Sequence, residues 1–203
     1  MMNNIRRSAL ASLEYSTDAK TWLQGKGERF IRKLGITEGQ SILDFGCRIG
    51  HYVIPTAVVV GPTGRVFALD KDHDSLDFLI KNAKKLDLDN HIIPIKTTGE
   101  LNIPLEDDCI DVVLLYDIIH IIIGIDGTLK PLQLLLTELS RVLKSGGLLS
   151  ISISEGHLRE VNYTKQDIID EINKIFTYRN LFKEEIMHWD WLLIGQVDNF
   201  FLA

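Results

Sequence analysis

The sequence predicts an α/β fold, with a doubly wound and mostly parallel sheet, helices on both faces and an antiparallel hairpin at the C-terminal end. First, short apolar runs alternate five times with amphipathic helix-like segments, which is typical of βαβ units. Second, residues 110–116 are nearly all apolar, as a strand covered on both faces should be. Third, the last two strand-like segments have no helix between them, so they can pair only as antiparallel neighbours.

Length and composition indicate one globular domain. The chain has 203 residues, of which 45% are hydrophobic and 25% are charged. We expect the domain to cover residues 18–203, after a loose N-terminal arm at residues 1–17 whose pattern is weakly periodic. The net charge of −6 and the lack of a basic patch argue against a nucleic-acid partner.

No segment predicts membrane association or secretion. The apolar run 118–125 is interrupted by His120 and Gly124 and is too short to span a bilayer, and the N-terminus lacks an apolar signal-peptide core. Cys47 and Cys109 are the two cysteines, which argues against a disulfide framework. We therefore expect a cytoplasmic protein.

The first half of the chain supplies three strands and three helices. A helix is expected from Asp18, as its N-cap, to Leu34, where Gly35 ends it. The other two helices are expected to begin near His51 and, with Asp74 as N-cap, to run to about residue 86. The expected strands are 41–45, 65–69 and 91–96.

The second half continues the alternation and then ends in the hairpin. Pro131 fits the first turn of a helix that runs to residue 143, where Ser145 and two glycines end it. Thr164 and Asp167 resemble a capping box for a helix through about residue 177. The expected strands are 110–116, 148–154, 181–190 and 191–202.

The stretch 41–51 has the pattern of a nucleotide-cofactor site. An apolar strand ends on Asp44, and Gly46 and Gly50 follow before a helix. Glycines let the backbone approach a ligand, and the free N–H groups of a helix start attract negative charge. Asp70 ends the next strand, 20 residues beyond Gly50, where a carboxylate can accept hydrogen bonds from both ribose hydroxyls.

Two better-known nucleotide motifs are absent from this stretch. The dinucleotide fingerprint G-x-G-x-x-G fails, because the chain reads Gly-Cys-Arg-Ile-Gly-His from Gly46. A Walker A loop fails as well, since no Gly-Lys-Ser/Thr follows. The remaining pattern is Asp-x-Gly-x-x-x-Gly, with an acid at the end of the second strand.

Five segments together resemble the successive motifs of class I S-adenosylmethionine-dependent methyltransferases of the small-molecule type. These segments are 42–50, 66–70, 103–113, 116–120 and 139–147, and the resemblance covers roughly residues 20–203. It implies a seven-stranded sheet of order 3-2-1-4-5-7-6, S-adenosyl-L-methionine as cofactor and in-line methyl transfer to a small-molecule acceptor. The sulfonium of such a cofactor is already activated, so the protein mainly has to align the reactants.

The resemblance also implies roles for individual residues. Asp44 would face the amino group of the methionine moiety, Asp70 would hold the ribose and Lys71 would flank the adenine. Tyr116 and Asp117 would lie near the methionine end and the acceptor. The complete cofactor-binding set that we predict is Asp44, Gly46, Cys47, Arg48, Gly50, Asp70, Lys71, Gly99, Glu100 and Tyr116.

The sequence departs from the family pattern at two places. Arg48 stands where the family has glycine; it either turns outward or pairs with the cofactor carboxylate, or it fills the pocket. The acid expected beside the adenine, near Gly99, is missing or displaced onto Glu100. The alternative hypothesis is therefore a non-catalytic binding or assembly module with a degenerate cofactor loop.

No residue is identified as catalytic. His120, Tyr116 and Asp117 are the candidates, and structural packing is the alternative for His120 among isoleucines and for Tyr116. Cys47 has no histidine base nearby in the sequence, which argues against a thiol nucleophile. The spacing of the other histidines predicts no metal site; they are His51, His73, His91, His157 and His188.

Two apolar segments have more than one interpretation. Residues 121–127 are either a lid over the acceptor or a surface for a partner subunit. Trp189 and Trp191 predict packing within the edge hairpin, and a homodimer surface is the alternative for them.

Overall fold

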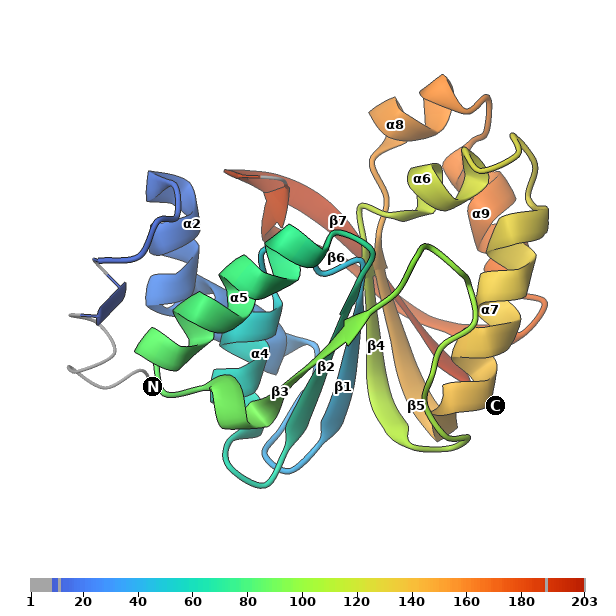
Figure 1. Cartoon of the computed structure of the whole chain (residues 1–203). Coiled ribbons are helices and arrows are strands. Elements are labelled where there is room, and N and C mark those ends of the chain that lie inside the picture. Colours follow the sequence, from blue (N-terminus) through green and yellow to red (C-terminus); the bar gives the residue numbers. More distant parts are fainter. Residues whose placement is uncertain (1–8, 11, 189, 203) are drawn as a thin grey trace. The chain divides into compact units, whose positions relative to one another are not determined.

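The computed structural model describes residues 9–10, 12–188 and 190–202. Seven strands form one sheet in the order β3-β2-β1-β4-β5-β7-β6, with helices packed around it (Figure 1). The predicted fold class is therefore confirmed, including the strand order and the C-terminal hairpin of β6 and β7. The strands are β1 (Ser41–Phe45), β2 (Arg65–Asp70), β3 (Ile92–Lys96), β4 (Ile110–Tyr116), β5 (Leu143–Ser152), β6 (Phe176–His188) and β7 (Trp191–Leu202).

The chain divides into two compact units. The first unit combines Met1–Thr98 with Glu184–Ile194, and the second combines Gly99–Lys183 with Gly195–Ala203. The helices of the first unit are α2 (Thr17–Thr21), the π-helix η1 (Trp22–Lys26), α3 (Gly27–Lys33), α4 (Val53–Val60), α5 (His73–Lys85) and the 3-10 helix η2 (Asp89–His91). Those of the second unit are α6 (Ile119–Ile123), α7 (Lys130–Val142), α8 (Glu155–Glu160) and α9 (Lys165–Ile172).

In the first unit, β1 and β3 both pair with β2 in parallel. Ile42 lies opposite Val66, and Val66 lies opposite Ile92, so all three strands end at the same edge. Helix α4 packs against β1 and β2, and every residue of it except Val58 is buried. This burial explains why its sequence is apolar on nearly all sides. The helix begins at Val53, two residues after the expected start near His51.

The N-terminal residues are packed more closely than we expected. Leu10, Leu13 and Tyr15 are buried, so the prediction of a loose arm is wrong for this part of residues 1–17. Residues 1–8 of the expected arm lie outside the described residues. The first helix is capped by Ser16, whose hydroxyl accepts from the N–H of Ala19, rather than by Asp18.

Other helices of the first unit also begin or break at residues that differ from the prediction. Helix α5 is capped by Asp72, which accepts from Ser75 N–H, and not by Asp74. Gly25 has φ 135° and interrupts the helix expected over residues 18–34, which the structure divides into three helical segments. The side chain that can reach a free N–H group decides where a helix begins, and periodicity alone does not show this.

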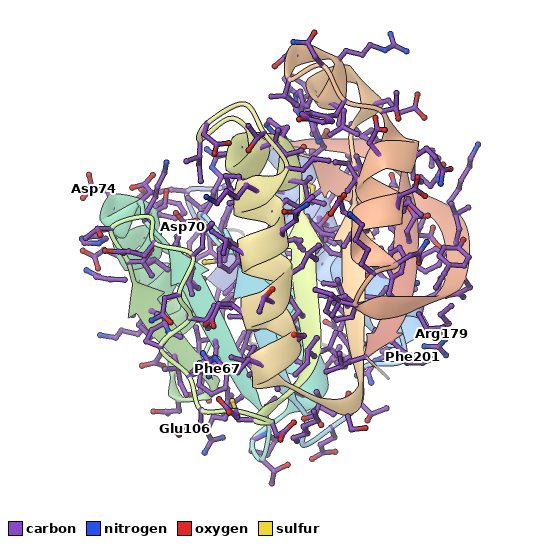
Figure 2. All side chains as sticks on the ribbon, turned by 90° about the vertical axis from the view of Figure 1, so that its right-hand side faces the viewer. Phe67, Asp70, Asp74, Glu106, Arg179 and Phe201 are labelled. Carbon is purple, nitrogen blue, oxygen red and sulfur yellow. The ribbon has the colours of Figure 1, made fainter. Side chains whose placement is uncertain are left out.

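In the second unit, β4 pairs with β5 in parallel and β5 pairs with β7 antiparallel. The capping box of α9 is confirmed, since the hydroxyl of Thr164 and the carboxylate of Asp167 each accept a backbone N–H of the other residue. Arg179 on β6 stacks over Phe201 on β7, with its guanidinium carbon 4.7 Å from the ring centroid (Figure 2 labels both). This contact lies within the observed hairpin, whose first strand begins at Phe176 rather than at residue 181 as predicted.

Several other elements of the second unit differ from the prediction. Strand β5 begins at Leu143 rather than at residue 148, and α9 ends at Ile172 rather than near residue 177. Helix α8 was not predicted, and α6 forms from part of the apolar segment interpreted as a lid or a partner surface. Among the described residues, no helix combines the length and apolar character that crossing a bilayer would need.

Candidate functional site

The loop after β1 (residues 46–50), which we call the glycine loop, is held against the end of β2 by backbone hydrogen bonds. The N–H groups of Gly46 and Cys47 both donate to the carbonyl oxygen of Leu69, at 2.8 and 3.1 Å. The N–H of Gly50 donates to the carbonyl oxygen of Cys47 at 2.9 Å and closes the turn. Asp44, the penultimate residue of β1, and Asp70, the last residue of β2, are thereby held in one compact region.

Gly50 is required at its position for two reasons. Its φ of 86° lies in the left-handed region, and a Cβ atom built on it would lie 2.2 Å from Cδ1 of Leu79 on α5. Any side chain here would therefore force the buried Leu79 side chain to shift as well as strain the backbone. The sequence analysis assigned this glycine to a close approach between backbone and ligand, and the contact with Leu79 is an additional requirement that it did not foresee.

Asp70 is oriented by two backbone N–H groups. Its Oδ2 atom accepts from Arg48 N–H at 2.6 Å, and its Oδ1 atom accepts from Asp72 N–H at 2.8 Å. The side chain is buried and lies at the end of β2, where Figure 2 labels it. Each carboxylate oxygen can accept a further hydrogen bond. The two backbone contacts therefore orient the carboxylate and still leave it able to accept hydrogen bonds from a ligand.

Asp44 is a buried carboxyl group with an unsatisfied oxygen. It is 3% exposed, and its Oδ2 atom has no hydrogen-bond partner among the described residues. Burial, followed by repulsion from Asp70, raises the pKa of Asp44 to about 8. A buried group in this state is costly unless something else contacts it, and a cationic ligand would remove the cost.

Cys47 does not have the properties of a nucleophile. Burial raises the pKa of its thiol well above the ordinary value, and the negative charges of Asp44 and Asp70 raise it further. A reactive cysteine needs the opposite environment, because the thiolate is the nucleophilic form. These surroundings agree with the expectation that Cys47 lines the site without reacting.

The Arg48 side chain is exposed, although its backbone takes part in the loop. Its φ of 45° is in the left-handed region, which accounts for the glycine that the family has here. Its positive charge helps to lower the pKa of His51 and that of Asp72, after the larger effects of burial and of hydrogen bonds, respectively. Of the two alternatives, the outward orientation of Arg48 is therefore the one that its exposure favours.

Two aromatic residues from the N-terminal region support the loop, and the sequence analysis missed this function. The hydroxyl of Tyr15 donates to the carbonyl oxygen of Ile49 at 2.7 Å, and Trp22 Nε1 donates to that of His51 at 2.8 Å. Both side chains are buried, and the Tyr15 ring packs edge-on against Phe78 of α5. A buried tyrosine or tryptophan usually needs a polar partner, which was the available signal.

The other predicted cofactor residues are distributed over both units. Lys71 in the first unit is exposed, as are Gly99 and Glu100 at the start of the second unit. Tyr116 is buried at the end of β4, and its hydroxyl lies 2.7 Å from Ser150 Oγ. This hydrogen bond supports the packing interpretation of Tyr116 over an acid-base function.

The second unit also brings together three side chains that the sequence did not connect. Asp117 and His120 follow β4, and His157 lies on α8. His157 Nδ1 is 3.0 Å from Asp117 Oδ1, and His120 Nδ1 is 4.0 Å from the same oxygen. The expectation that the histidines form no metal site considered sequence spacing alone and overlooked this cluster.

Comparison with known proteins places the chain in a family. The family profile described as "Methyltransferase domain" matches residues 36–196, which is most of the chain and includes both the glycine loop and β4. The chain belongs to this methyltransferase family. The resemblance that the motifs indicated is therefore confirmed.

Two of the relatives that the chain resembles are named as methyltransferases. The chain is 35% identical over 66 residues to the "Probable cobalt-precorrin-6B C(15)-methyltransferase (decarboxylating)" of Saccharolobus solfataricus, a match that covers 32% of this chain and 33% of that protein. It is 30% identical over 127 residues to the "Demethylmenaquinone methyltransferase" of Lactobacillus johnsonii, covering 63% and 49%. The chain thus spans about half the length of these curated relatives, or less.

Solved structures show the same fold. A SAM-dependent methyltransferase from Aquifex aeolicus matches with a TM-score of 0.69 and 20% identity, over 93% of this chain and all of that one. At this identity the match establishes the class I, Rossmann-like architecture and leaves the acceptor open.

Proposed function

We propose that this protein is a methyltransferase that binds S-adenosyl-L-methionine through Asp44, Asp70 and the glycine loop and transfers its methyl group to a small-molecule acceptor. The single observation that carries the proposal is the Asp44 carboxyl group, which is buried beside Asp70 with its Oδ2 atom unpartnered. The family membership and the fold agree with it.

The cofactor carries a positive charge and hydrogen-bond donors that can pair with these two acids. S-adenosyl-L-methionine carries an ammonium group, which would neutralise Asp44 and donate hydrogen bonds to Oδ2. Its ribose has two hydroxyl groups, and Asp70 has two oriented carboxylate oxygens that can accept them. The charge and the hydrogen-bonding capacity of the residues present therefore fit this ligand.

The chemistry requires little from the side chains. When bound, the cofactor supplies a methyl group already activated by its sulfonium. The residues of the chain hold the nucleoside and the amino-acid end, and Gly46 and Gly50 keep the turn free of side chains. A protein base is needed only if the acceptor has to lose a proton, and Asp117 and His120 remain the candidates for that.

A small acceptor is the class that the relatives support. The two named above carry names that refer to a precorrin and to demethylmenaquinone, both of which are small molecules rather than polymers. The negative net charge of −6 argues in the same direction, against a large nucleic acid. With both cysteines free, a cytoplasmic location stays the prediction.

The alternative, a non-catalytic module with a degenerate loop, is the weaker proposal. It rested on Arg48 and on the missing acid near Gly99. Because the Arg48 side chain is exposed, the first of these two objections loses most of its force. Lys71, Gly99, Glu100 and Tyr116 stay predicted parts of the cofactor site.

Titration calorimetry with S-adenosylmethionine and S-adenosylhomocysteine tests the proposal. We expect the native chain to bind both, and Asp44→Asn and Asp70→Asn to weaken both. Asp74→Asn is the matched control, since Asp74 is an exposed acid in the first turn of α5 (Figure 2). No binding of either compound at millimolar concentration, or equal affinities in all four proteins, would refute the cofactor site.

A further inference from the structure

We propose that Asp117, His120 and His157 form a binding site for a divalent first-row transition-metal ion of the Zn²⁺ class. The three side chains come from two segments that lie 37 residues apart, counted from His120 to His157. Each offers one ligand atom, and these atoms all lie within 4.8 Å of one another. The site goes beyond methyl transfer, because metal binding can be measured without cofactor or acceptor.

The fold holds the three ligands close together independently of any ion. Asp117 directly follows β4, and its N–H donates to the carbonyl oxygen of Ser152 at the end of β5. His120 lies on α6 and His157 on α8, two helices that contact each other, and the imidazole centroids are 4.3 Å apart. The parallel pairing of β4 with β5 therefore delivers both segments to one place.

The distances suit a metal after a small adjustment. Zinc lies about 2.0–2.2 Å from imidazole nitrogen and carboxylate oxygen, so tetrahedral ligand atoms are about 3.3 Å apart. The His157–Asp117 pair is at 3.0 Å and the His120–Asp117 pair is at 4.0 Å. An ion would replace the proton that now links His157 to Asp117, and the His120 ring would have to move closer to the other two ligands, because the three ligand atoms are spread over as much as 4.8 Å.

The donor set selects the kind of ion. Two imidazoles and one carboxylate suit Zn²⁺ and its neighbours in the first transition row, whereas Mg²⁺ and Ca²⁺ prefer sites built from oxygen. With neutral imidazoles the three ligands carry one negative charge, which a divalent cation offsets. We therefore expect binding of Zn²⁺ and Co²⁺ and much weaker binding of Mg²⁺.

The site is accessible and coordinatively open. The side chains of Asp117, His120 and His157 are 21%, 16% and 24% exposed, so an ion can enter from solvent. Asp117 and His120 also line a shallow surface depression, together with Ile119, Ser152 and Leu158, which has no room for a water molecule in its interior. Three protein ligands leave one position of a tetrahedral ion for water from the solvent side, as in catalytic rather than structural zinc sites.

The backbone at Asp117 adds an independent observation. Its φ of 53° lies in the left-handed region, which a non-glycine residue adopts at some cost in free energy. In this conformation the carboxylate forms the 3.0 Å contact with His157. Asparagine tolerates the same conformation well, so Asp117→Asn removes the charged ligand while preserving the local fold.

The test uses the full chain after treatment with a chelator. Zn²⁺ is titrated by calorimetry and Co²⁺ by visible absorption, where d–d bands report coordination by the protein. We expect one equivalent of each ion to bind. Asp117→Asn, His120→Gln and His157→Gln should each weaken binding by at least about tenfold, since even outer-shell changes commonly have effects of that size.

Two controls keep the outcome decisive. His73→Gln removes an exposed histidine of the first unit and should leave the affinity for Zn²⁺ unchanged. Thermal melting shows whether each variant folds. If a histidine variant does not fold, the comparison of Asp117→Asn with the native chain still tests the metal site. Failure to bind either ion below millimolar concentration, or binding that the three substitutions leave unchanged, would overturn the metal site without affecting the proposed cofactor site.

Discussion

Proton release on cofactor binding is the sharpest consequence of the Asp44 environment. In the free protein, burial and the charge of Asp70 raise the pKa of Asp44 to about 8, so the carboxyl group is mostly protonated at neutral pH. An ammonium group placed against it would stabilise the carboxylate and lower this pKa. Binding should therefore expel the proton into the buffer.

The size of the effect follows from the pKa. With a value of about 8, roughly nine-tenths of the Asp44 carboxyl groups carry a proton at pH 7. An α-amino group has an ordinary pKa of about 7.7–8.0, so the cofactor takes up roughly 0.1 proton when bound as the ammonium form. The net release should be close to 0.8 proton per cofactor at pH 7, and it should fall toward zero near pH 8.

Calorimetry measures this release directly. The binding enthalpy is recorded at pH 7 in buffers of different ionisation enthalpy. The slope of the binding enthalpy plotted against the ionisation enthalpy of the buffer gives the number of protons transferred. Asp44→Asn should lose the release, because the amide cannot titrate, whereas Asp74→Asn should keep it. A slope of zero in the native protein, or an equal slope in Asp44→Asn, would refute the assignment of Asp44 as the partner of the ammonium group.

Three further predictions concern the same loop. Arg48→Gly should change the affinity for S-adenosylmethionine by less than about 0.5 kcal/mol, because the side chain is exposed; a large gain in the calorimetric affinity would instead show that the arginine obstructs the site. Gly50→Ala should destabilise the protein by about 2 kcal/mol or more in urea unfolding, since it adds the clash with Leu79 to the backbone cost. Gly35→Ala, at φ 93° with open space around it, should show only the backbone cost, and equal losses in the two variants would contradict this reasoning. Asp44 disfavours folding progressively as the pH rises from about 4 to about 8, because its carboxyl group holds a proton in the folded state that the unfolded state has already lost. The melting temperature of Asp44→Asn relative to the native chain should therefore increase between pH 5 and pH 8, and a constant difference would disprove the raised pKa.

Much of the fold could be predicted because its signals are local and repeated. Strand β4 has the predicted bounds. Six of its seven residues are apolar or aromatic, and the acid Asp117 directly follows the strand. The α9 capping box was predicted from Thr164 and Asp167, which are three residues apart. Signals of this kind depend on neighbours in the chain, so the sequence alone contains them.

The missed elements depend on contacts between distant segments. The residues before Asp18 show little periodicity, yet Tyr15 is buried because its hydroxyl reaches the carbonyl oxygen of Ile49. Helix α8 has only six residues and one buried side chain, Leu158, which gives no amphipathic pattern to read. Tertiary packing, which the local sequence pattern does not show, therefore determines the burial of Tyr15 and the formation of α8.

The same division applies to the candidate site. Asp44 and Asp70 could be proposed from the sequence, because each is the last or penultimate residue of a strand and parallel strands end at one edge. His157 could not be connected with Asp117 in advance, since their contact spans 40 residues and depends on where α8 packs. The interpretation of Trp189 as hairpin packing or as part of a dimer surface lies outside the described residues, and Trp191 is exposed.

A crystal structure of the full chain with bound S-adenosylhomocysteine tests the central claim most directly. We predict that the amino group of the ligand lies within hydrogen-bond distance of Asp44, that both ribose hydroxyls lie at Asp70, and that the Arg48 guanidinium lies outside the pocket. Density for the ligand at another place, or the Arg48 side chain occupying the hollow beside the two aspartates, would contradict it.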